Sequence, residues 1–319
     1  MIRLWRILYH PYTWMYGIFL WVLGRLDEHR ASGLADALVP LFTLPFRSQL
    51  RSNLKRFFGL EAQPSNDRVV SLERTHLRYL STLTASFARL PEISQADLER
   101  SVVVTGEEHI SAALRLGRGA LLMMDHFGNG WHWMALLASR GYRISVLSNR
   151  TPMSVVNRHI LRIARRFTFD LVRPGLDAFR QAREVLNRNE IFVLTCDASI
   201  HSRNCQAVPF GNAYLQVHLG PGVLAIRSRA PVLRMMTKVL PSGQSHTSVA
   251  PPLEIPPATN PRMDSAALLR SWIGELEEAT MANPEQWFLW GYVPLGDAPT
   301  ANLPPCRTES ASAEPQDAE

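Results

Sequence analysis

Short apolar runs alternate with stretches of helical periodicity along most of the chain. The clearest run, residues 120–124, is long enough for a buried strand, and a helix-like apolar stretch begins at Trp131. Further strands are expected at residues 102–104, 142–147, 191–195 and 232–239. Helices are expected at residues 71–90, 95–100, 107–116, 155–166, 176–188, 220–228 and 265–281. Strands that alternate with helices indicate an α/β fold, and we expect a mixed, largely parallel sheet flanked by helices.

Residues 1–60 have a different pattern. Residues 11–24 carry no charge and are rich in Trp and Tyr, but these fourteen residues fall short of the roughly 20 that a bilayer-spanning helix needs. We therefore expect an interfacial or re-entrant membrane helix with its aromatic side chains at headgroup depth. A basic amphipathic segment that suits an anionic leaflet follows, with Arg47, Arg51, Lys55 and Arg56. The alternative is that these segments are ordinary core helices.

The chain is expected to divide into three parts. Residues 1–60 form a helical membrane-associating segment, and residues 61–296 form the α/β domain. Residues 297–319 are rich in Pro, Ser, Ala and Glu and net negative, which predicts a disordered acidic tail. The sequence contains no evident internal repeat.

Composition indicates a globular, basic protein. Hydrophobic residues make up 46% of the 319 residues, and the formal net charge is +6. A basic surface favours an anionic partner such as a membrane face, an acidic protein or nucleic acid. The charges are spread out, without the dense Lys/Arg blocks of a nucleic-acid tail, so we expect a membrane surface and no nucleic acid. The three cysteines are odd in number and indicate no disulfide framework.

Three polar side chains closely follow expected strands: His126, Arg150 and Asp197. Because the carboxyl ends of parallel strands meet at one edge of a sheet, we expect them to converge there. Gly128 and Gly130 let the backbone approach a substrate, and the first N–H groups of the helix that follows can face a developing negative charge. No metal-ligand spacing is convincing, and there is no nucleophile elbow or P-loop, so we expect no metal and no cofactor.

Four sequence segments together carry a resemblance to a known family. They are GEEHISAALRLGRGALLMMDHFGN, REVLNRNEIFVLTCDAS, VPFGNAYLQVHLGPGVLAIRSRAPVL and NPEQWFLW. With them the chain resembles, over roughly residues 1–292, the late acyltransferases of lipid A biosynthesis, which are lauroyl/myristoyl transferases of the lysophospholipid acyltransferase superfamily. The resemblance implies a glycerolipid acyltransferase-like fold, acyl carrier protein as the acyl donor, and attachment to the cytoplasmic face of the bacterial inner membrane.

The chain departs from the family at one motif. The family has an acid five residues after its catalytic His, whereas a Trp stands five residues after His126. If Gly130 is an insertion, His132 takes the place of the acid. Such an acid holds the His ring in one tautomer and stabilises the imidazolium that forms. His132 could orient the ring but could not supply the charge, which Asp125 or Asp197 could supply instead.

The resemblance implies an O-acyltransferase that moves an acyl chain from an acyl carrier protein thioester to a hydroxyl of a lipid A precursor or of another glycolipid or lipid. In this interpretation, His126 acts as the general base, and the first N–H groups of the next helix or Arg150 stabilise the oxyanion. The catalytic candidates are His126, His132, Arg150 and Asp197. The candidates for substrate binding are Gly128, Asn129, Trp131 and Phe210.

Structural and functional alternatives stay open beside this hypothesis. His126 and His132 could be ordinary buried histidines, and Arg150 could be a surface residue at a strand end. Asp197 could be a turn or helix-cap residue, and Phe210 with Gly211 also fits a turn. The missing acid also permits a non-catalytic lipid- or carrier-binding protein of the same fold. A thioesterase, with water in place of the acceptor alcohol, is the second enzymatic alternative.

Overall fold

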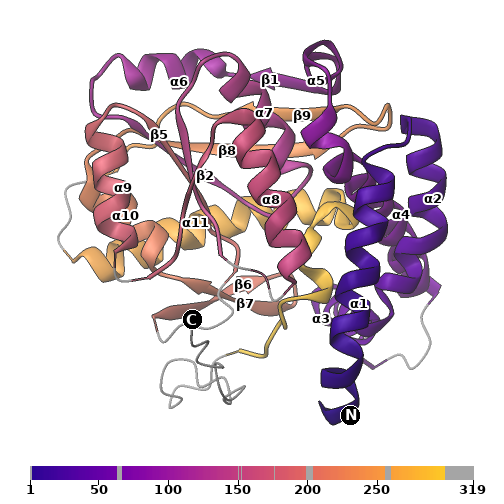
Figure 1. Ribbon diagram of the computed structural model, residues 1–319. Helices are drawn as coiled ribbons and strands as arrows, with labels where there is room; N and C mark the ends of the chain where they lie inside the picture. Colours follow the sequence, from indigo (N-terminus) through magenta and orange to yellow (C-terminus); the bar gives the residue numbers. More distant parts are fainter. Residues whose placement is uncertain are drawn as a thin grey trace.

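A seven-stranded sheet with the strand order β1-β9-β8-β2-β5-β3-β4 is the centre of the computed structural model (Figure 1). The structure describes residues 2–62, 67–149, 151, 153–175, 177–198, 204–255 and 260–298. The strands of this sheet are β1 (Val102–Thr105), β2 (Ala120–Met124), β3 (Ile144–Leu147), β4 (Asp170–Val172), β5 (Ile191–Thr195), β8 (Val232–Val239) and β9 (Ser245–Val249). β2 is parallel to β5 and β8, and β3 is parallel to β4 and β5, whereas β9 is antiparallel to β8. The expected mixed, largely parallel sheet is confirmed.

Helices cover both faces of the sheet, which explains why its central strands are apolar throughout. The helices of this domain are α5 (Gln95–Ser101), α6 (Glu107–Leu114), α7 (Gly130–Ser139), α8 (Ser154–Phe167), α9 (Ala178–Asn187), α10 (Gly220–Ser228) and α11 (Pro261–Ala282). In β2, Leu121 and Met123 belong to a core with residues of α9, α10 and α11, whereas Leu122 and Met124 belong to a core with residues of α7 and α8. Central strands buried on two faces give the sheet a rigid edge at which side chains can be placed accurately.

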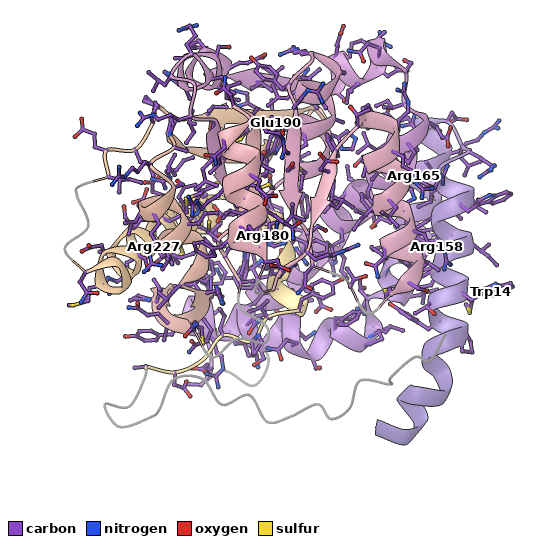
Figure 2. All side chains as sticks on the ribbon, turned by 60° about the vertical axis from the view of Figure 1, so that its left-hand side comes forward. Trp14, Arg158, Arg165, Arg180, Glu190 and Arg227 are labelled. Atoms are coloured by element: carbon purple, nitrogen blue, oxygen red, sulfur yellow. The ribbon has the colours of Figure 1, made fainter. Side chains whose placement is uncertain are left out.

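Four N-terminal helices lie together at one side of the sheet (Figure 1). They are α1 (Ile2–Leu23), α2 (Glu28–Phe42), α3 (Arg47–Phe58) and α4 (Asp67–Arg89). Phe19, Leu20 and Leu23 of α1 are buried against residues of α2 and α4, so this part of α1 belongs to a core. The opposite side of α1 is exposed, and Trp14 points away from the protein (Figure 2).

Among the helices that the structure describes, none is both long and apolar enough to span a membrane. Residues 11–23 of the uncharged run lie in α1, which has one buried and one exposed apolar side. Association of this segment with a membrane stays a prediction.

Several strands lie where the sequence analysis expected none. β4 forms one edge of the sheet and β9 lies between β1 and β8. β6 (Cys205–Phe210) pairs with β7 (Ala213–His218) in an antiparallel hairpin around Gly211. The strand expected at residues 142–147 begins only at Ile144. The expected strands at residues 191–195 and 232–239 have the observed bounds. All but the first two residues of the expected acidic tail lie outside the described part of the chain.

Candidate active site

The ends of β2 and β5 bring His126 and Asp197 together. The two strands are parallel and in register, with Met124 opposite Thr195, and each side chain follows its strand by two residues. Nδ1 of His126 lies 2.7 Å from Oδ1 of Asp197. The backbone N–H of His126 donates to Oδ2 of Asp197 at 2.8 Å. The convergence that the strand ends predicted is therefore present for these two residues.

Asp197 is held as a carboxylate. It is fully buried, and besides the two donors of His126 it accepts a hydrogen bond of 3.0 Å from Nε1 of Trp287. Burial acts to raise the pKa of this carboxyl, but the neighbouring His126 charge and the hydrogen bonds from His126 and Trp287 keep the pKa of Asp197 below its usual value. A buried, ionised acid with three N–H donors can orient a neighbouring ring and balance its charge.

His126 has the properties of a proton acceptor. Burial of the ring disfavours its charged form, but the Asp197 carboxylate and its hydrogen bond outweigh burial, so the pKa of His126 is raised above its usual value. Because Asp197 is ionised, Nδ1 of His126 is the nitrogen that donates, and Nε2 keeps the lone pair. The His126 side chain is 37% exposed, which leaves the ring open to an incoming substrate.

The loop after His126 is held by a segment from near the end of the described chain, around η3 (Pro284–Gln286) and η4 (Phe288–Gly291). The His126 carbonyl accepts from the N–H of Phe288 at 2.8 Å, and the N–H of Gly128 donates to the Gln286 carbonyl at 3.3 Å. The Tyr79 hydroxyl, from α4, donates to the Gly128 carbonyl at 2.7 Å. Contacts from two distant parts of the sequence thus fix the backbone beside His126.

Gly128 occupies a position that no other residue fits. Its φ is +66°, and a Cβ atom there would lie 2.2 Å from the carbonyl oxygen of Thr237. α7 begins two residues later, at Gly130. The first N–H groups of a helix have no partner inside it, so this turn places free donors close to His126 in the sequence and near the same edge of the sheet.

His132 does not take the place of the family's acid. It is buried, and burial followed by the charge of Arg89 lowers its pKa to about 4, so it is neutral at pH 7. Nδ1 of His132 has no hydrogen-bond partner among the described residues, whereas the donor nitrogen of His126 is hydrogen-bonded to Asp197. The structure corrects the pairing of His132 with His126: the acid that orients His126 comes from the next strand of the sheet, and not from α7.

The other candidates lie in different environments. Asn129 is buried, and its Nδ2 donates to Oγ of Ser86 at 3.1 Å, while its Oδ1 accepts no hydrogen bond from the part of the chain that the structure describes. Trp131 is half-buried and packs against the core beside Phe87. Arg150 lies outside the described residues.

Phe210, at the end of β6, is fully buried and presents no surface to a substrate in this structure. Its ring centroid lies 4.9 Å from that of Phe57 and 4.9 Å from that of Trp287. Phe210 therefore packs against Trp287, the residue that donates a hydrogen bond to Asp197. Its buried position corrects the expectation of direct substrate contact.

A second buried acid, Asp125, precedes His126. Its Oδ1 accepts from Nε1 of Trp272 at 2.7 Å, and the Arg234 guanidinium stacks over the Trp272 ring. Burial, and then the negative charge of Asp197, raises the pKa of Asp125 well above its usual value, which favours the neutral form of Asp125. Asp197, and not Asp125, is thus the counter-charge of His126.

The tryptophans that bond the two acids were not among the candidates expected from the sequence. Trp272 lies within the helix expected at residues 265–281, to which no role was assigned. Trp287 lies in the NPEQWFLW segment, which carried the resemblance without an assigned contact. Within the described ranges, no group of three or more His, Cys, Asp or Glu side chains could hold a metal ion.

The comparisons with known proteins point to one family. A family model described as "Bacterial lipid A biosynthesis acyltransferase" matches residues 2–290. The chain is 31% identical over 193 residues to a phosphatidylinositol mannoside acyltransferase of Mycobacterium tuberculosis, covering 58% of this chain and 59% of the relative. It is 26% identical over 189 residues to a protein of the same name from Mycolicibacterium smegmatis, covering 57% and 60%. The chain thus spans about three-fifths of the length of the curated relatives it matches.

Proposed function

The chain belongs to the bacterial lipid A biosynthesis acyltransferase family, and from this premise we propose that it transfers an acyl group from a thioester to a hydroxyl of a lipid or glycolipid. The observation that carries the proposal is the His126–Asp197 pair at the edge of the sheet. The alternative of a degenerate binding protein was motivated by the missing acid after His126. Asp197 supplies an acid from another strand, so that motive is removed.

The reaction follows from the protonation states of this pair. Nε2 of His126 removes the proton of the acceptor hydroxyl while the oxygen attacks the thioester carbonyl, which forms the new C–O bond. Asp197 stabilises the imidazolium through Nδ1. The tetrahedral intermediate then collapses, the C–S bond breaks, and the leaving thiolate takes the proton from Nε2. The products are an ester and a free thiol, and His126 returns to its neutral form.

The oxyanion of the intermediate needs donors close to His126. The free N–H groups at the start of α7, at Gly130 and Trp131, are the donors that we assign to it. Arg150 remains a second proposed donor, since it follows β3, which is the neighbour of β5. Preorganised backbone donors of this kind typically contribute about 10²–10³-fold in rate.

The donor and acceptor are proposed at the level of chemical class. The mycobacterial relatives are called phosphatidylinositol mannoside acyltransferases, which supports a glycolipid acceptor for this chain. A lipid A precursor is the acceptor that the family description supports. Acyl carrier protein is the donor that we propose, in line with the resemblance of the sequence to the late acyltransferases.

The proposed location is the cytoplasmic face of the bacterial inner membrane. Trp14, Ile18 and Trp21 lie on one side of α1 and are exposed, as is Met15 beside them. Aromatic and aliphatic side chains in such a row suit insertion at headgroup depth, and no spanning helix is needed for that.

One experiment separates the possible reactions. The purified full chain in detergent is incubated with radiolabelled acyl carrier protein thioesters and a total lipid extract, and the products are separated by thin-layer chromatography. We expect label in a lipid band. Label released as free fatty acid would indicate a thioesterase instead, and label that stays on the carrier protein would indicate a binding protein.

A further inference from the structure

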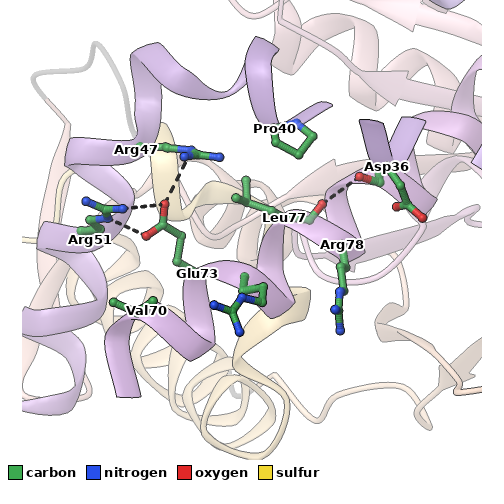
Figure 3. A pocket seen from close by; sticks show the side chains of 10 residues that line it. Asp36, Pro40, Arg47, Arg51, Val70, Glu73, Leu77 and Arg78 are labelled. Atoms are coloured by element: carbon green, nitrogen blue, oxygen red, sulfur yellow. Dashed lines mark hydrogen bonds and ion pairs between the residues drawn. The ribbon is translucent and has the colours of Figure 1, made fainter. Parts of the chain in front are cut away.

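A cavity separate from the His126 site lies between α2, α3 and α4 (Figure 3). Its volume is about 440 Å³, within the range typical of small-ligand pockets. Its charged lining residues come from three helices of the N-terminal group: Asp36, Arg47, Arg51, Glu73, Arg74 and Arg78. Four arginines and two acids thus line one cavity.

Two of the arginines are anchored on a buried acid. Glu73 is buried, and its Oε2 and Oε1 accept from Nε and Nη2 of Arg51 at 2.5 and 3.2 Å (Figure 3). Nε of Arg47 lies 3.6 Å from Oε1 of Glu73, too far for a hydrogen bond, and the described residues offer this buried nitrogen no hydrogen-bond partner. Glu73 therefore orders both side chains while one buried donor of Arg47 stays unsatisfied.

The other two arginines are available for a ligand. Arg74 and Arg78 are exposed on α4, and the described part of the chain offers them no ion pair within 4.0 Å. Counted as formal charges, the four arginines and two acids of the lining give a net charge of +2. A phosphate monoester carries about −1.5 to −2 at pH 7, which matches this charge.

The residue types of the lining also fit a phosphate ester. A tetrahedral phosphate can accept from several planar guanidinium forks at once, which is the geometry that Arg recognises best. Pro40, Val70 and Leu77 supply apolar wall beside the charges, which suits the organic part of an ester better than a bare ion. A carboxylate ligand has only two oxygens and about half the negative charge of a phosphate monoester.

We propose that the cavity between α2, α3 and α4 is a binding site for a phosphate ester, carried either by a lipid headgroup or by a soluble metabolite. Arg74 and Arg78 make the first contacts, and Arg47 and Arg51 complete the site at its floor beside Glu73. The site does not depend on the chemistry at His126, so its test uses binding and not turnover.

The test compares two double variants that remove the same charge. Arg74→Gln/Arg78→Gln removes the two arginines of α4, and Gln keeps the helix propensity. Arg158→Gln/Arg165→Gln removes two exposed arginines of α8 as the matched control (Figure 2). Glycerol 3-phosphate binding to the full chain is measured by calorimetry. Recovery on phosphatidylcholine vesicles is measured with and without phosphatidic acid, and thermal unfolding checks that all variants are folded.

A loss of about tenfold or more in affinity for glycerol 3-phosphate in the α4 variant alone supports a site for soluble phosphate esters. If glycerol 3-phosphate does not bind, loss of the phosphatidic acid-dependent vesicle recovery in the α4 variant alone supports a lipid headgroup. The proposal is overturned if the α8 variant loses as much as the α4 variant, because the effect is then diffuse charge. It is also overturned if neither probe distinguishes the wild-type protein from the α4 variant.

Discussion

Asp197 sets the protonation behaviour of His126, because it is the charge that raises the pKa of the ring against burial. His126 must be neutral to accept a proton, so the rate of transfer should rise with pH through this raised pKa. Asp197→Asn removes the charge and leaves the burial. We expect the acid limb of the pH–rate profile to move to lower pH, and the maximal rate to fall about 10²–10⁴-fold.

His132 provides the comparison for that experiment. Its pKa of about 4 and its lack of a bond to Asp197 mean that it does not titrate with His126. We expect His132→Gln to leave the acid limb where it is in the wild-type protein. A shift in His132→Gln as large as that in Asp197→Asn would show that the two histidines form the working pair after all.

Both chemical candidates at the sheet edge could be predicted from the sequence, and Asp197 was one of the two acids expected to supply the charge, but the choice between Asp125 and Asp197 could not be made. His126 and Asp197 each follow an apolar run, and parallel strands bring such positions together. The family motif, with Gly130 taken as an insertion, suggested His132 as the group that orients the ring. Asp197 is 71 residues away, and only the register of β2 with β5 shows that it reaches Nδ1.

Among the structural elements, the turn between β2 and α7 depends on Gly128. Gly128→Ala would force a side chain into the left-handed region and onto the Thr237 carbonyl. Gly117 has a similar φ of +69° but open space around it, so Gly117→Ala carries only the conformational cost of about 1–2 kcal/mol. Chemical denaturation should show a clearly larger loss of stability for Gly128→Ala, together with loss of transfer. Equal losses in the two variants would contradict the close approach to Thr237.

The exposed side of α1 is where we expect the membrane contact. Deleting residues 1–30 would also remove Phe19, Leu20 and Leu23 from a core, so it cannot separate attachment from folding. Trp14→Gln/Trp21→Gln changes only side chains that are 67% and 53% exposed. We expect this variant to leave the membrane pellet in a high-salt wash.

The control for the α1 variant replaces exposed leucines elsewhere. Leu116→Gln/Leu240→Gln removes side chains that are 57% and 38% exposed, far from α1 in the sequence, and should stay in the pellet. Equal retention of the α1 variant and this control would exclude α1 as the attachment site.

The strands that were not expected from the sequence lack a clear apolar pattern, for physical reasons that differ from strand to strand. Ser245 and Thr247 of β9 are buried polar residues whose positions an apolar pattern does not mark. β4 has only three residues, too few for a period to show. Pro209 in β6 weakens a strand assignment, although the alternation of β7 was a usable signal. Buried apolar strands were the elements that periodicity could locate.

At the scale of the whole molecule, the site is assembled from parts that lie far apart in the chain. His126 follows β2, and Asp197 follows β5. The segment around η3 and η4 supplies the Trp287 donor and the hydrogen bonds that hold the loop after His126. The sequence could predict the layer architecture and the edge that holds the site. It could not predict this third contribution, because packing from the end of the described chain has no local pattern.

The measurement that tests the central claim most directly is the initial rate of radiolabel transfer from acyl carrier protein thioester into lipid by His126→Ala. His29→Ala, at an exposed position on α2, is the matched control. If His126 is the general base, its replacement should lower the rate about 10²–10⁴-fold while the protein stays folded and His29→Ala stays at the wild-type rate. Transfer by folded His126→Ala at the wild-type rate would contradict the account.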